Sequence, residues 1–167
     1  MLLYNPTYDI YHGVFRILRI LETLEIKPYR IEFIRIADFY FLFPHLFSDI
    51  RMPNEFRKLK SRTANLKNNY NEVPNHKGLL RELLKCQLMA IKSIAGAGLI
   101  DKENFQKGVV IRTSKQLPEK LIELINLDKA YRSYINDVIL ALSELTLQGP
   151  DGLKARTKLM EFRYDIV

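Results

Sequence analysis

Apolar residues recur at helical spacing along most of the chain. In each such segment they fall on one side of a 3.6-residue period, which is the pattern of a helix packed on a core. The pattern predicts seven helices, the last of them short, over residues 11–24, 29–43, 54–67, 79–97, 117–126, 131–146 and 153–162. β-branched and aromatic residues leave a strand open as an alternative within 31–36. The chain is therefore predicted to be mainly α.

The first helix is apolar around most of its circumference. Its polar positions form one narrow stripe, which consists of His12, Arg16, Arg19 and Thr23. Thr7 or Asp9 could cap its start. A helix with so little polar surface is expected to pack on several sides, either inside a domain or against a partner.

The segment from residue 79 to 113 predicts the small β element. Its helix should stop at Gly98, a residue suited to a left-handed C-terminal position. Leu99-Ile100 then reads as a short strand, followed by a polar turn and a second strand at 108–113. Helix, glycine stop and two short strands are typical of the end of a winged helix. We expect a winged-helix-like domain over 1–115, with a basic insertion around 51–75, and a C-terminal helical extension over 116–167 packed on it.

An aromatic block lies at the end of the second helix and just beyond it. One amphipathic face cannot cover so many rings, so about half are expected in the core. The others would be exposed in a monomer and would suggest contact with a protein partner. The candidate partner interface is Phe39, Tyr40, Phe41, Phe43 and Phe47.

The chain carries a net charge of +7, and its basic residues are concentrated between residues 51 and 67. Such a cluster attracts phosphate backbones or an acidic protein surface. The candidate DNA or phosphate contacts are Arg57, Lys58, Lys60 and Arg62. The wing would add Lys102, Lys107 and Arg112. The alternative is an ordinary solvated helix face.

No catalytic, cofactor-binding or metal-binding motif is recognisable. The three histidines are scattered, and Gly96-Ala97-Gly98 lies at a helix end, where the dipole has the wrong sign for phosphate. Asp38 stands in an apolar block, and we expect it to pair with Arg35 or Arg30. The single cysteine, Cys86, is expected to act as a small hydrophobic residue on a helix face. These patterns argue against enzymatic activity and a bound cofactor.

The first residues contain no basic segment followed by an apolar stretch, so no secretory signal is expected. No window approaches the roughly 20 apolar residues that span a bilayer. We therefore expect a soluble, cytoplasmic protein with no membrane partner.

Several apolar blocks resemble the middle component of bacterial three-component ABC-ATPase conflict systems, a group that includes the Lamassu anti-phage and anti-plasmid systems. The matching blocks are Tyr4-Asn5-Pro6, Tyr11-His12, Phe15-Arg16-Ile17-Leu18, the run from Ile34 to Pro44, the run from Ala95 to Ile100, and the run from Gly108 to Thr113. They cover about the first two-thirds of the chain and include no catalytic motif.

The resemblance implies a non-enzymatic accessory subunit. Its partners would be an SMC/Rad50-like ABC ATPase and an effector subunit, often a nuclease, which it would bridge or regulate. The charge cluster keeps a second hypothesis open, in which the chain is a stand-alone winged-helix regulator that binds double-stranded DNA.

Overall fold

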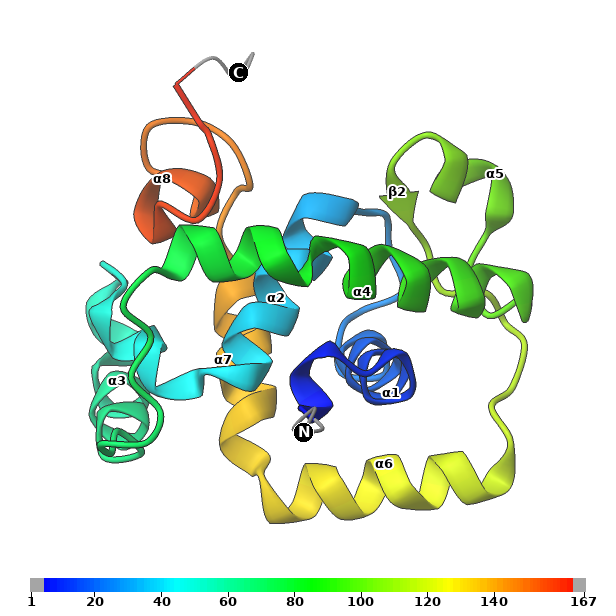
Figure 1. Ribbon diagram of the computed structural model, residues 1–167, viewed down its shortest axis with the longest axis horizontal. Coiled ribbons are helices and arrows are strands. Elements are labelled where there is room, and N and C mark those ends of the chain that lie inside the picture. Colours follow the sequence, from blue (N-terminus) through cyan, green and yellow to red (C-terminus); the bar gives the residue numbers. More distant parts are fainter. Residues whose placement is uncertain (1–4, 164–167) are drawn as a thin grey trace.

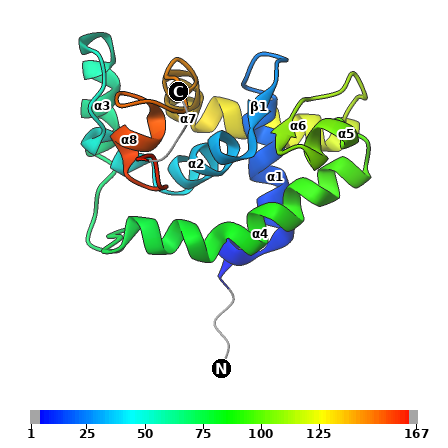
Figure 2. The ribbon, with the colours of Figure 1, turned by 90° about the horizontal axis from the view of Figure 1, so that it is seen from above.

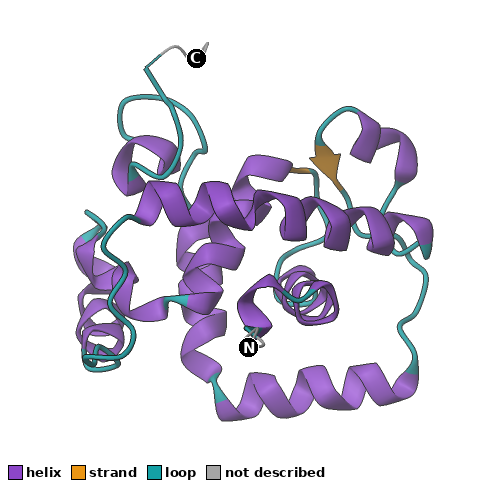
Figure 3. Ribbon diagram, in the orientation of Figure 1, coloured by secondary structure: helices purple, strands orange, loops and turns teal. Residues whose placement is uncertain are grey.

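The computed structural model describes residues 5–163 and is mainly helical, with one small two-stranded antiparallel sheet (Figures 1 and 3). Its α-helices are α1 Ile10–Leu21, α2 Ile31–Leu42, α3 Arg57–Ala64, α4 His76–Gly96, α5 Lys102–Gln106, α6 Glu119–Tyr131, α7 Ser133–Ser143 and α8 Leu153–Thr157. Short 3-10 helices cover Pro6–Tyr8, Pro44–Asp49 and Asn54–Phe56. The strands are β1 Tyr29–Arg30 and β2 Val109–Val110. Residues 1–4 lie outside the described residues. They include the start of the segment in which no secretory signal is expected, and Tyr4 of the first matching block.

The helices lie where the hydrophobic pattern predicts them, with shifted ends. The side chain of Asp9 caps α1 by accepting from the backbone N–H groups of Tyr11 and His12. Gly98 has φ +74°, so the predicted left-handed stop after α4 is confirmed. The predicted polar turn after Ile100 is wrong, because residues 102–106 form helix α5. Asp101 caps that helix by accepting from the N–H of Asn104 at 2.8 Å.

The sheet joins segments far apart in the sequence. Tyr29 pairs with Val110 and Arg30 with Val109, both antiparallel, and Ile100 forms a further antiparallel bridge with Arg112. The segment from Val109 to Arg112 therefore lies between β1 on one side and Ile100 on the other. The order α1, β1, α2, α4, the Ile100 bridge and β2 is compatible with a winged-helix arrangement. Two helices depart from the predicted order: α3 is inserted between α2 and α4, and α5 lies between Ile100 and β2.

The core is built around α1, which packs against α2 and α4 (Figure 2). At the crossing with α4, a Cβ on Gly13 would lie 3.3 Å from both Cys86 Sγ and Ala90 Cβ, so the glycine lets the two helices approach closely. Helix α7 packs against α2 from another side. The buried apolar residues form one cluster, which includes residues from before and after residue 115.

Candidate functional site

The predicted aromatic interface is mostly core. Phe39, Tyr40, Phe41 and Phe47 are each no more than 4% exposed, and only Phe43 is half-buried. Phe39 packs against the rings of Tyr40 and Phe43, and the guanidinium of Arg132 lies 4.8 Å above the Phe41 ring. The expectation that about half of these rings face solvent is wrong. The reason is that α7 and the 3-10 helix Pro44–Asp49 cover α2 on sides that a single-helix projection leaves open.

The outer face of α6 is the apolar surface that the sequence interpretation missed. Leu124, Leu127 and Tyr131 are 49%, 68% and 89% exposed. At 100° per residue they fall within about 60° of arc, so they form one stripe. Ile125 is the one α6 residue that is fully buried. The sequence could have revealed this surface, because α6 contains more apolar residues than one buried helix face can hold.

Two polar contacts hold α6 against the end of α1. Arg19, which is buried, donates from Nε to Asp128 Oδ2 at 3.0 Å, and Asp128 also accepts from Arg132. Lys129 donates from Nζ to the backbone carbonyl of Glu22. Burial of Arg19 lowers its pKa, although the nearby carboxylate of Asp128 opposes this shift. These contacts orient α6 so that its apolar stripe points away from α1.

The predicted phosphate contacts on α3 do not share one face. At 100° per residue, Arg57, Lys58, Lys60 and Arg62 spread over about 200° of arc. Arg62 is also engaged within the chain: it donates to Ser133 Oγ at 3.2 Å, lies 3.7 Å from Asp137, and stacks over the Tyr134 ring. Arg57 and Lys58 are exposed, and Lys60 is half-buried.

The predicted wing cations are also divided. Arg112 is used internally, because it donates from Nε to Glu22 Oε1 at 2.7 Å and from Nη1 to the Leu99 carbonyl at 3.1 Å. Lys102 and Lys107 are exposed on and just after α5. Only these two of the three wing residues face solvent.

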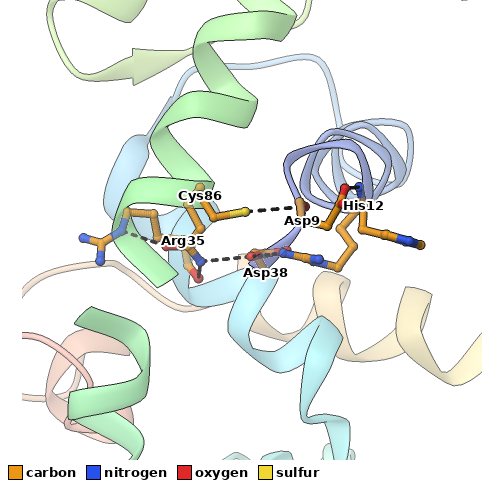
Figure 4. Close-up of polar contacts among 7 residues, drawn as sticks. Asp9, His12, Arg35, Asp38 and Cys86 are labelled. Carbon is orange, nitrogen blue, oxygen red and sulfur yellow. Dashed lines mark hydrogen bonds and ion pairs between the residues drawn. The ribbon is translucent and has the colours of Figure 1, made fainter. Parts of the chain in front are cut away.

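A buried polar network joins α1, α2 and α4 (Figure 4). Arg16 donates to Asp38 through Nε at 2.6 Å and through Nη2 at 3.2 Å, and Gln87 Nε2 donates to Asp38 Oδ2 at 3.0 Å. Arg35 donates to Gln87 Oε1 and to the Leu80 carbonyl. The predicted pairing of Asp38 with Arg35 or Arg30 is therefore wrong: Arg35 reaches α4, and Arg16 of α1 takes its place. Each polar group of Asp38 is occupied, which is the environment of a structural carboxylate.

Cys86 and His45 also lie in structural surroundings. The thiol of Cys86 contacts the backbone carbonyl of Asp9 at 3.5 Å, and burial raises its pKa. His45 is buried in the 3-10 helix after α2, where burial lowers its pKa. Within residues 5–163 no three His, Cys, Asp or Glu side chains are grouped so that they could hold a metal ion. In the same range, none of the helices combines the length and the hydropathy that a membrane span requires.

The family model of the ABC-three component (ABC-3C) system Middle Component 5 matches residues 2–165. The chain belongs to this family. It is thus a middle component of a multi-component ABC system, in agreement with the family resemblance of its apolar blocks. No curated protein and no solved structure matches the chain. A middle component of such a system has partner components, so part of its surface is expected to contact them.

Proposed function

We propose that this middle component is a non-enzymatic accessory subunit of a bacterial anti-phage or anti-plasmid defence complex of the Lamassu type. In that complex it bridges or regulates an SMC/Rad50-like ABC ATPase and an effector, often a nuclease. Family membership supports the multi-component assembly. The single observation that carries the proposal on this chain is the exposed apolar stripe on α6.

The α6 stripe has the composition of a protein contact surface. Three apolar side chains spaced by three and four residues form a continuous ridge of the kind that enters a hydrophobic groove. Tyr131 lies at one end of the ridge, and tyrosine is enriched at energetically important interface positions. The rest of the chain leaves most of the surface of Leu127 and Tyr131 exposed. A partner could therefore bury both side chains.

The partner at this stripe is, in our proposal, the ATPase component rather than a second copy of the chain. The support is family membership, because the family consists of middle components of three-component ABC systems. A bridging subunit needs a protein-binding face for a neighbour of different sequence. The fixed orientation of α6, which Arg19 and Lys129 secure, suits a preformed docking surface.

The second part of the proposal is that this chain catalyses no reaction. The fully buried carboxylate of Asp38 is engaged by Arg16 and Gln87, and the raised pKa of the Cys86 thiol disfavours a nucleophilic thiolate. ATP hydrolysis and any cleavage of nucleic acid would then belong to the partners. The purified chain should hydrolyse neither ATP nor DNA, whereas the assembled complex should do so.

Co-expression with the products of the two adjacent genes tests the proposal. A tag on this chain should retain both products through gel filtration, at a defined stoichiometry. If the chain elutes as a monomer while the other two products associate without it, the accessory role is contradicted. Hydrolysis of ATP or DNA by the isolated chain, abolished by a substitution within it, would contradict the non-enzymatic part.

A further inference from the structure

The exposed face of α4 is strongly basic. Lys77, Arg81, Lys85 and Lys92 are all exposed, and at 100° per residue they fall within about 80° of arc. From Lys77 to Lys92 the row extends for about 22 Å along the helix. One helix thus presents four cations in a single line, which the four basic residues of α3 do not.

Little negative charge opposes this row. The one acidic residue of α4 is Glu82, whose carboxylate accepts from Tyr8 Oη at 3.0 Å at the edge of the row. The pKa of the Glu161 carboxyl is lowered mainly by the backbone N–H groups of Arg163 and Phe162, and the nearby charge of Lys77 acts in the same direction. Within the described part of the chain, Arg81, Lys85 and Lys92 form no ion pair or side-chain hydrogen bond. Three adjacent cations are therefore available to an external anion.

The position of α4 in the fold adds an independent argument. It is the last long helix before the Ile100–Arg112 bridge and strand β2, and it follows α2 as the groove-entering helix follows its partner in a helix-turn-helix. The exposed Lys102 begins α5, and the exposed Lys107 directly follows it. Helix α4 runs along the outside of the molecule and crosses α1, and α2 lies behind it (Figures 1 and 2).

The composition of the face selects among acidic ligands. Single-stranded nucleic acids are bound by aromatic platforms, and α4 contains no Phe, Tyr or Trp. The major groove of double-stranded RNA is too deep and narrow for side chains to read, whereas that of B-form DNA admits a helix. A protein partner would need apolar anchors, and Met89 is the one large hydrophobic side chain exposed on α4.

We propose that the basic face of α4 binds the phosphate backbone of double-stranded DNA, with Arg81, Lys85 and Lys92 as its main contacts. This inference goes beyond the accessory role and does not depend on the α6 contact. Helix α1 lies between α4 and α6 in Figure 1. DNA on α4 would thus leave the α6 stripe free for a protein partner.

Fluorescence anisotropy with a 24-base-pair duplex tests the proposal on the full chain. The triple variant Arg81→Glu, Lys85→Glu, Lys92→Glu should bind at least ten-fold more weakly than the unmodified chain in low salt. The slope of log affinity against log salt should fall by roughly 2 to 3, at about 0.9 per phosphate contact. The matched control is Arg57→Glu, Lys58→Glu, Lys60→Glu, which makes the same change of charge on α3.

Each alternative has its own outcome. No binding of the duplex by the unmodified chain, or equal losses in the two triple variants, would overturn the proposal. A loss confined to the α3 variant would move the site to that helix. Unchanged DNA binding by the α4 variant, together with loss of a protein component from the co-expressed complex, would reassign the face to an acidic protein. Circular dichroism and thermal melting must first show that both variants are folded.

Discussion

Arg16 of α1 and Asp38 of α2 form a buried bidentate ion pair, with 2.6 Å between Arg16 Nε and Asp38 Oδ1. Gln87 of α4 donates to the same carboxylate, so one acidic side chain connects the three central helices. A buried pair of this kind costs desolvation, and its removal leaves a charge without compensation. The pair fixes how α1, α2 and α4 sit together, and thus the position of the α4 basic face.

Asp38→Asn should destabilise the fold by about 3 to 5 kcal/mol, because it leaves the Arg16 guanidinium buried beside a neutral amide. Urea denaturation followed by circular dichroism measures the loss. The control is Asp137→Asn, which removes an exposed partner of Arg62 and should cost about 0.5 kcal/mol or less. Equal effects of the two substitutions would mean that the central pair does not hold the helices together.

Gly13→Leu should lower the free energy of unfolding by about 1 to 3 kcal/mol, because the added side chain must displace Cys86 or Ala90 at the contact of α1 with α4. The matched control is Gly96→Leu, because a Cβ at Gly96 meets no atom within 4 Å. The free energy of unfolding of the control should be unchanged or slightly higher. A tolerated leucine at position 13 would show that the two helices are not in close contact.

The stability of the fold should depend on the protonation of His45. Burial lowers the pKa of His45 in the folded chain, and Lys67 and His76 act in the same direction against Asp49 and the Asn71 backbone. The unfolded chain therefore takes up the proton first, at a pKa of about 6.5. The stabilising contribution is present above that pH and is lost as the pH falls below it.

Urea titrations from pH 7.5 to pH 5.5 measure this dependence. The denaturation midpoint of the unmodified chain should fall toward acid pH, and His45→Leu should remove part of that fall. A His45 variant that loses stability with falling pH as steeply as the unmodified chain would exclude His45 as the titrating group.

The helices were predictable from local sequence, whereas their lateral contacts were not. The cap at Asp9 and the left-handed stop at Gly98 are local features. They depend on residues within one helical turn, so the sequence next to each helix end reveals them. The partner of Asp38 depends on how α1 crosses α2, and no spacing rule within α2 identifies Arg16. For the same reason the pattern predicts that about half of the rings in the aromatic block face solvent, although α7 packs against α2 and Arg132 lies over the Phe41 ring.

The candidate surfaces show the same limit. A count of basic residues in a window favoured the segment from Arg57 to Arg62, but it ignores where each side chain points around the helix. The α4 cations are more widely spaced in sequence and lie within a mostly apolar segment, so no window count reveals them. Residues four apart on a helix share a face, and applying that rule to the polar side of α4 would have found the row.

The central claim is that this middle component acts through a protein partner bound at α6. Native mass spectrometry of the co-expressed complex tests it most directly, with Tyr131→Asp compared against Tyr70→Asp, since both tyrosines are almost fully exposed. Tyr131→Asp should shift the ATPase component out of the complex while the variant remains folded, and Tyr70→Asp should leave the complex intact. A complex that retains the ATPase component at full occupancy with Tyr131→Asp and with Leu127→Asp would contradict the account.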